Sequence, residues 1–215
     1  MNAWLQAPVA GFAIRWVLCS TVGLGMGLAL GLSLSRSIEA FVGMMLVTPV
    51  ILALAGSVFG ASQWLAVWKW QRAAIAWIAA SAVALGAGMT LGIVIVETAG
   101  RAITGEQVRL FGIDPVGRIV GLAVIGSFTG LTVGAAQRLA LRLYGAALGF
   151  WVARCTAAFG LGLPGAALVA DVWLGGLQRP AGFVTFLGLA GLIVGLLTLR
   201  GAERVPAELA VRRAV

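Results

Sequence analysis

The sequence predicts an all-α, polytopic integral membrane protein whose six transmembrane helices are arranged as three parallel hairpin repeats. Two observations lead to this class. The 215 residues are 61% hydrophobic and only 10% charged, whereas soluble domains are about half apolar and a quarter charged. Two short motifs that contain glycine also recur three times along the chain, each time inside an apolar segment.

Six segments are long enough to cross a bilayer, which requires about 20 predominantly apolar residues. They are residues 13–34, 40–63, 73–96, 119–137, 145–169 and 182–200. The first segment is long enough to span and lacks a typical cleavage site, so we interpret it as a transmembrane helix rather than a signal peptide. The 31 glycines agree with this class, because glycine is commoner in transmembrane helices than in soluble ones.

The first repeated motif is Gly-x-x-x-Gly, near the end of the second, fourth and sixth segments. Its copies are Gly56 and Gly60 followed by Gln63, Gly130 and Gly134 followed by Gln137, and Gly191 and Gly195 followed by Thr198. Residues four apart share a helix face, and small residues there let a second backbone approach closely in lipid. We therefore expect these six glycines to form helix-packing surfaces.

The second motif begins the first, third and fifth segments, with a tryptophan followed by a Gly-x-Gly pair. Its copies start at Trp16, Trp77 and Trp151. The two motifs are 40 positions apart in the first and third copies but 53 apart in the middle copy, which has a longer outer loop over 97–118. Because each repeat is a complete hairpin, all three should insert in the same direction and pack around a pseudo-threefold axis.

We interpret the whole chain, 1–215, as a single six-helix domain. The hairpin repeats cover about 13–64, 73–138 and 145–200, and a tail follows over 201–215. In the long outer loop, Thr104 to Gln107 resembles a capping box and predicts a short interfacial helix. This loop is either a solvated connection or a functional lid or docking segment.

Lysine and arginine are distributed unequally between the two ends of the predicted bundle. The end that holds both termini and the loops 64–72 and 138–144 has many cations and only Glu203 and Glu208 as acids. At the opposite end the charges balance: Arg36, Arg101, Arg109, Arg118 and Arg179 against Glu39, Glu97, Glu106, Asp114 and Asp171. Since Lys and Arg favour cytoplasmic loops, both termini are predicted to be cytoplasmic, in a bacterial inner membrane.

The same orientation bias accounts for the net charge of +8 without a nucleic-acid surface. Most tryptophans also fall at this end, where their amphipathic rings are expected at headgroup level. They are Trp4, Trp16, Trp64, Trp68, Trp70, Trp77 and Trp151, with Trp173 alone at the other end.

The chain offers little for catalysis. It has no histidine, which is the commonest general base and metal ligand. No carboxylate falls near the middle of a predicted span, and neither Cys19 nor Cys155 belongs to a metal or disulfide motif. We therefore expect no enzymatic activity, no cofactor and no metal site.

Three polar or glycine features have two interpretations each. Gln63 and Gln137, with Thr198 in the third copy, either join helices by hydrogen bonds or form a polar ring that binds a headgroup or solute. Arg154, about one turn into a span, either extends to the headgroups or binds an anionic lipid or ligand. The glycine strip at 23, 25, 27 and 31 serves internal packing or docks a helix of another subunit.

The segment from Gly56 to Trp77 combines a Gly-x-x-x-Gly-x-x-Gln-Trp boundary, a basic loop and a helix that begins with tryptophan. It resembles bacterial multi-spanning membrane proteins without an assigned activity, so the resemblance implies a helix plan but no chemistry. Arg138 and Thr198 depart from this motif in the later copies. In size and topology alone, the chain is also similar to the substrate-binding subunits of energy-coupling-factor transporters, whose first helix docks a partner through small residues.

The leading functional hypothesis is a non-catalytic accessory or scaffold subunit of a larger inner-membrane assembly. Its expected partners are other membrane subunits and anionic lipids of the bilayer, not nucleic acid. The alternative is a protein that binds or transports a small solute or a lipid. A lipid-modifying enzyme is the third hypothesis, and it lacks a nucleophile or metal site in the sequence.

Overall fold

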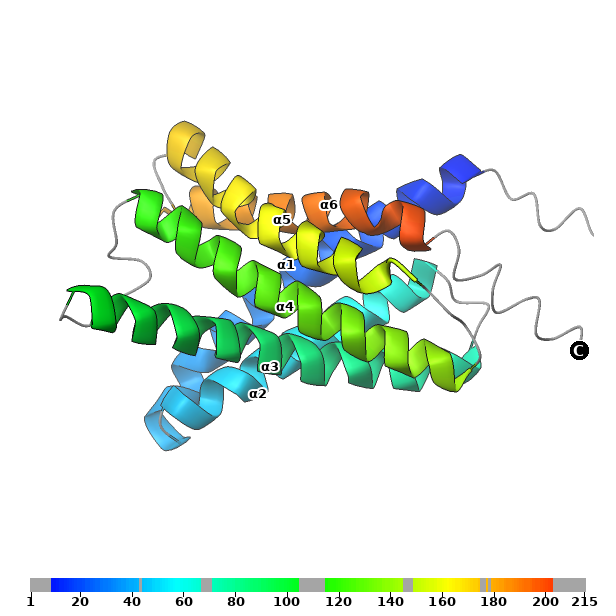
Figure 1. The fold of residues 1–215 in the computed structure, drawn as a ribbon, viewed down its shortest axis with the longest axis horizontal. Helices are drawn as coiled ribbons and strands as arrows, with labels where there is room; N and C mark the ends of the chain where they lie inside the picture. The colour runs from blue at the N-terminus through cyan, green and yellow to red at the C-terminus, as the bar shows by residue number, and fades with distance from the viewer. Residues whose placement is uncertain are drawn as a thin grey trace, which may run out of the picture.

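The computed structural model describes residues 9–42, 44–66, 71–104, 115–144, 149–174, 177 and 179–202. These residues form six α-helices (Figure 1). The helices are α1 (Val9–Val42), α2 (Met44–Ala66), α3 (Gln71–Thr104), α4 (Pro115–Leu143), α5 (Trp151–Leu174) and α6 (Pro180–Ala202). Each contains a segment long and apolar enough to cross a membrane. The predicted all-α fold with six transmembrane helices is confirmed.

Several helices extend beyond the predicted spans. α1 and α3 each contain 34 residues, about 51 Å at 1.5 Å per residue, which exceeds the ~30 Å hydrocarbon core. The prediction that the outer loop covers 97–118 is wrong at both ends, because α3 continues to Thr104 and α4 starts at Pro115. The predicted cap after Thr104 lies outside the described residues.

Backbone signals, rather than hydropathy, account for two of the observed helix starts. α4 and α6 both begin at a proline, Pro115 and Pro180. Proline suits the first helical position, since its φ is already helical and its missing N–H would have no partner there. A helix does not end where its sequence becomes polar, so the spans predicted from apolar runs are too short for α1, α3, α4 and α6. The spans predicted for α2 and α5 instead begin several residues too early, because the apolar run starts before the helix does.

The six helices form a closed ring. Each packs against the helices that precede and follow it in the chain, and α6 packs against α1. Figure 1 shows the start of α1 and the end of α6 at one end of the bundle, together with the last turns of α2 and α4. We call this the terminal end and the opposite one the far end.

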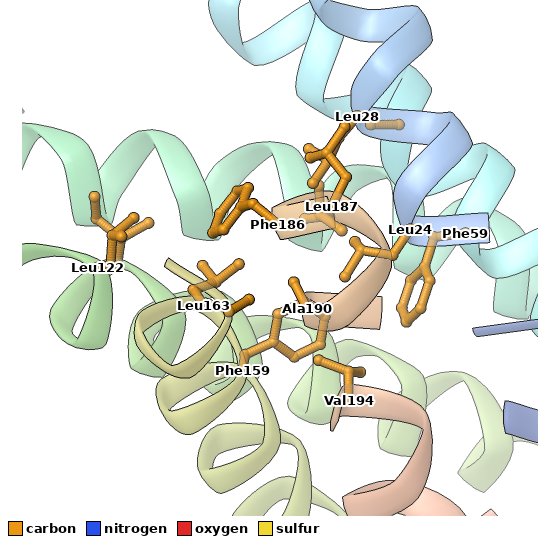
Figure 2. Close-up of a cluster of buried hydrophobic side chains, with 14 of the residues drawn as sticks. Leu24, Leu28, Phe59, Leu122, Phe159, Leu163, Phe186, Leu187, Ala190 and Val194 are labelled. Atoms are coloured by element: carbon orange, nitrogen blue, oxygen red, sulfur yellow. The ribbon is translucent and has the colours of Figure 1, made fainter. Parts of the chain in front are cut away.

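Apolar side chains fill the interior of the ring (Figure 2). Phe59 of α2 meets Phe159 of α5 edge to face, with 5.9 Å between ring centroids. Leu24 of α1 and Val194 of α6 lie in the same cluster and are 1% and 0% exposed. Large apolar side chains also cover the outside, as Ile75 and Val83 of α3 illustrate. This distribution fits a bundle whose outer surface faces lipid.

Candidate functional site

Each Gly-x-x-x-Gly motif lies against the next helix of the ring, at that helix's tryptophan motif. For the second glycine of each copy, an added Cβ would lie close to a Cβ of this neighbour. The pairs are Gly60 with Ser81 (2.7 Å), Gly134 with Cys155 (2.9 Å) and Gly195 with Ser20 (3.1 Å). The first glycine of each copy meets backbone: Gly56 faces Ser81 O, Gly130 faces Cys155 O and Gly191 faces Thr21 Cα. The three contacts occupy corresponding positions of the sequence motifs.

The Gly-x-Gly pairs leave two faces of each odd-numbered helix without a side chain at these positions. Residues two apart are separated by about 200° around a helix of 3.6 residues per turn. An added Cβ at Gly86 would lie 2.9 Å from Pro49 O of α2, whereas one at Gly88 would lie 2.8 Å from Thr129 Cα of α4. Each pair therefore lets one helix approach both of its neighbours.

The glycine strip of α1 follows the same rule. Gly23, Gly27 and Gly31 face α2, while Gly25 faces α6. An added Cβ at Gly27 would lie 2.6 Å from Ala55 O. The interpretation of this strip as a docking surface for another subunit is therefore wrong, because helices of the same chain already cover it.

Three tryptophans lie inside the terminal end of the ring. Trp16, Trp77 and Trp151 are 1%, 2% and 1% exposed. The ring centroids of Trp77 and Trp151 are 5.8 Å apart, and those of Trp16 and Trp151 are 6.2 Å apart. We use the name tryptophan layer for these indoles with the polar and thiol groups beside them: Ser20, Gln63, Ser81, Gln137, Cys155 and Thr198, all buried.

This burial corrects the expectation that the tryptophans face the headgroups. Trp64 is also buried, at 6% exposure, and lies beside Trp77. Trp173, at the far end, is 79% exposed, whereas Trp4, Trp68 and Trp70 lie outside the described residues. Sequence position gives the depth of a residue along a helix but not the direction of its side chain, and the indoles here point inward.

Hydrogen bonds connect the tryptophan layer across helices. Trp151 Nε1 donates to Gln137 Oε1 and Trp16 Nε1 donates to Thr198 Oγ1, both at 3.1 Å. Gln137 Nε2 donates to Ser81 Oγ at 2.8 Å and to Gln63 Oε1 at 3.2 Å. Two indoles thus bind the polar side chain of the preceding helix in the ring, and Gln137 joins all three hairpins.

This geometry favours helix joining over ligand binding for the glutamines. Gln63 and Gln137 are 2% and 1% exposed, and Gln63 Nε2 also approaches Ser20 Oγ at 3.5 Å. Their amides contact each other and neighbouring helices, so the surrounding bilayer does not reach them.

The third hairpin departs from the other two. Thr198 and Cys155 stand where the other hairpins have glutamine and serine, and the Thr198 hydroxyl donates to Val194 O of its own helix at 2.7 Å. Trp77 also differs: its Nε1 is buried and has no hydrogen-bond partner among the described residues. The corresponding acceptor, Gln63 Oε1, receives a bond from Gln137 instead.

Arg154 and Arg138 lie beside the tryptophan layer and are both half-buried. An added Cβ at Gly201 would lie 2.8 Å from Trp151 Cε3 and 3.4 Å from Arg154 Cδ. The stem of Arg154 therefore packs against the last turn of α6. Arg138 Nε is buried and has no partner in the described part of the chain.

The structure adds an ion pair that the sequence interpretation missed. Arg118, in the first turn of α4, binds Asp171, in the last turn of α5. Their side chains are only 12% and 18% exposed. Two opposite charges at similar depth on consecutive helices were the available signal, but pairing them requires the register between α4 and α5.

Comparisons with known proteins add no relative: no protein family, curated protein or solved structure matches the chain. The buried polar groups of the tryptophan layer mainly form hydrogen bonds between helices.

Proposed function

We propose that this chain is a non-catalytic accessory or scaffold subunit of a larger assembly in the bacterial inner membrane, with both termini cytoplasmic. Its three hairpins act as parallel repeats that build one rigid bundle. The main support is the tryptophan layer, whose amides, hydroxyls and indoles bind one another across all six helices. Such a layer fixes the register of a bundle, which suits a subunit that presents its outer helix faces to partners.

The alternative, a protein that binds or transports a small solute, receives less support. Its comparison with transporter subunits depended on a small-residue face of the first helix that docks a partner. Here α2 and α6 occupy that face. The polar groups that could have formed a solute site instead hydrogen-bond one another and their neighbours in the bundle.

Site-specific photo-crosslinking in intact membranes tests the proposal. A photoreactive amino acid would replace Val83 of α3, Leu161 of α5 or Val184 of α6, which are 69%, 61% and 67% exposed. Phe59, at 0% exposure, is the matched internal control. We expect adducts with one or a few discrete proteins from at least one outer helix face, and none from position 59.

Purification in mild detergent completes this test. Stoichiometric co-purification of the crosslinked protein supports the scaffold role. Adducts with lipid alone from all three outer positions, together with a small molecule that co-purifies, would contradict it and favour the transport alternative.

A further inference from the structure

Positive charge is uncompensated among the described residues of the terminal end. The arginines there whose side chains the structure describes are Arg15, Arg138, Arg142, Arg154 and Arg200. The carboxylates whose side chains the structure describes, Glu97 and Asp171, belong to the far end of α3 and α5. Cations gathered at a membrane surface attract anionic lipids, each contributing about 1 kcal/mol.

Two of these arginines differ from the rest. Arg15, Arg142 and Arg200 are exposed, whereas Arg138 and Arg154 are half-buried. Arg138 Nε is buried without a partner in the described part of the chain. A guanidinium that loses water needs an anion or an acceptor in its place, and phosphate is a geometric match for its planar fork.

Arg138 and Arg154 lie on the two sides of the first turn of α5. Arg138 directly follows Gln137, which accepts the hydrogen bond of Trp151, and Arg154 shares with Trp151 the contact with Gly201 of α6. No acidic residue lies in this first turn of α5. A cation there is unfavourable with respect to the helix dipole, and an anion bound beside it reverses the effect.

The surroundings also select the kind of anion. Leu139 directly follows Arg138, and Phe150 lies one turn before Arg154, whose backbone N–H donates to Phe150 O at 3.1 Å. Leu139 and Phe150 are 62% and 73% exposed. They provide apolar surface for acyl chains beside the two guanidinium groups. The site is not repeated: the motif positions of Arg154 hold Cys19 and Ala80 in the other hairpins, and those of Arg138 hold Trp64 and Leu199.

We propose that Arg138 and Arg154 each bind the phosphate group of an anionic phospholipid, on the α4 side and the α6 side of the first turn of α5. The fork of each guanidinium donates to phosphate oxygens, and the lipid tails cover Leu139 and Phe150. Lysine keeps the charge but cannot reproduce the bidentate geometry. A purely electrostatic attraction would therefore survive a change to lysine, whereas this site would not.

The test uses the full-length protein purified in phosphate-free buffer. Binding of phosphatidylglycerol, phosphatidylcholine and inorganic phosphate is measured by native mass spectrometry and by the shift in melting temperature. We expect phosphatidylglycerol to bind and to raise the melting temperature, and the other two to have little effect. Equal stabilisation by inorganic phosphate would show that the site binds a soluble anion and not a lipid. Equal binding of phosphatidylcholine would show that the net charge of the lipid does not matter. Either result would contradict the proposal.

Three matched variants complete the test. Arg138→Lys and Arg154→Lys should each weaken phosphatidylglycerol binding about tenfold, while exposed Arg142→Lys should bind like the wild type. Circular dichroism and a monodisperse elution profile control for folding, and the two site variants lie on different helices, so each tests the site independently. Wild-type affinity in both site variants, or an equal loss in Arg142→Lys, would overturn the proposal.

Discussion

A buried indole N–H in a membrane-embedded bundle has no water to bind, so its acceptor must come from the protein. Trp16 and Trp151 have such acceptors in Thr198 and Gln137. Trp77 has none among the described residues. The three tryptophans occupy the same motif position, but among the described residues Trp77 lacks the hydrogen bond that Trp16 and Trp151 make.

Substitution of two of these tryptophans should separate the hydrogen bond from the packing. Trp151→Phe removes indole packing and leaves Gln137 Oε1 without its donor, whereas Trp77→Phe removes the same ring volume and a donor that has no partner among the described residues. We expect Trp151→Phe to lower the free energy of unfolding by about 1–3 kcal/mol more than Trp77→Phe. The measurement is reversible unfolding in detergent, and equal losses would show that the indole bonds contribute nothing.

At the level of helices, the six ring contacts depend on glycines that a larger residue cannot replace. Gly134→Leu would push α4 away from α5, because even a Cβ there meets Cys155 Cβ at 2.9 Å. Gly188, also inside a helix, is the matched control, since a Cβ there meets nothing within 4 Å. We expect Gly134→Leu and Gly60→Leu to cost more than about 2 kcal/mol and Gly188→Leu to keep a monodisperse elution profile. Equal tolerance at all three positions would contradict the packing role.

The ion pair between α4 and α5 provides a second prediction for helices. Asp171→Asn should lower stability by about 3 kcal/mol, since it leaves Arg118 buried without its anion. The double exchange Arg118→Asp with Asp171→Arg should recover most of this loss. It restores the pair and places each charge at the helix end that the dipole favours. A double variant no more stable than Asp171→Asn would show that the pair itself contributes little.

Which features of the fold were predictable from the sequence depends on the physical rule behind each prediction. The number of helices was predictable because lipid requires about 20 apolar residues per span. The helix ends were not predictable in this way. α4 starts at Pro115 and α3 continues to Thr104, both outside the apolar runs used to draw the spans. The inward direction of Trp16, Trp77 and Trp151 and the partners of Gln137 depend on rotation and register between helices, which single-helix patterns do not contain.

The orientation of the whole molecule in the membrane decides which side of the bilayer holds the proposed lipid site and which parts of the chain cytoplasmic partners can reach. Single cysteines placed at either terminus or within 67–70 should be protected from a membrane-impermeant thiol reagent in intact cells, after Cys19 and Cys155 are replaced by serine. A cysteine within 105–114 should be labelled. The reverse pattern would show that the excess of arginine marks the outer side.

The chain closes on itself, with the last helix packed on the first and the tryptophan layer inside. The contact between α6 and α1 brings Gly195 and Ser20 together, where an added Cβ would lie 3.1 Å from Ser20 Cβ. A disulfide needs about 3.5–4.5 Å between Cβ atoms, so a small local adjustment suffices.

Disulfide crosslinking of Ser20→Cys with Gly195→Cys tests this closure most directly, in membranes and without the native cysteines. We predict rapid intramolecular crosslinking, detected by a gel shift that reductant reverses. Leu18→Cys with Gly195→Cys is the control, because Leu18 is 57% exposed on the outer face of α1. No crosslink between 20 and 195, or an equally fast one from position 18, would contradict the closed ring.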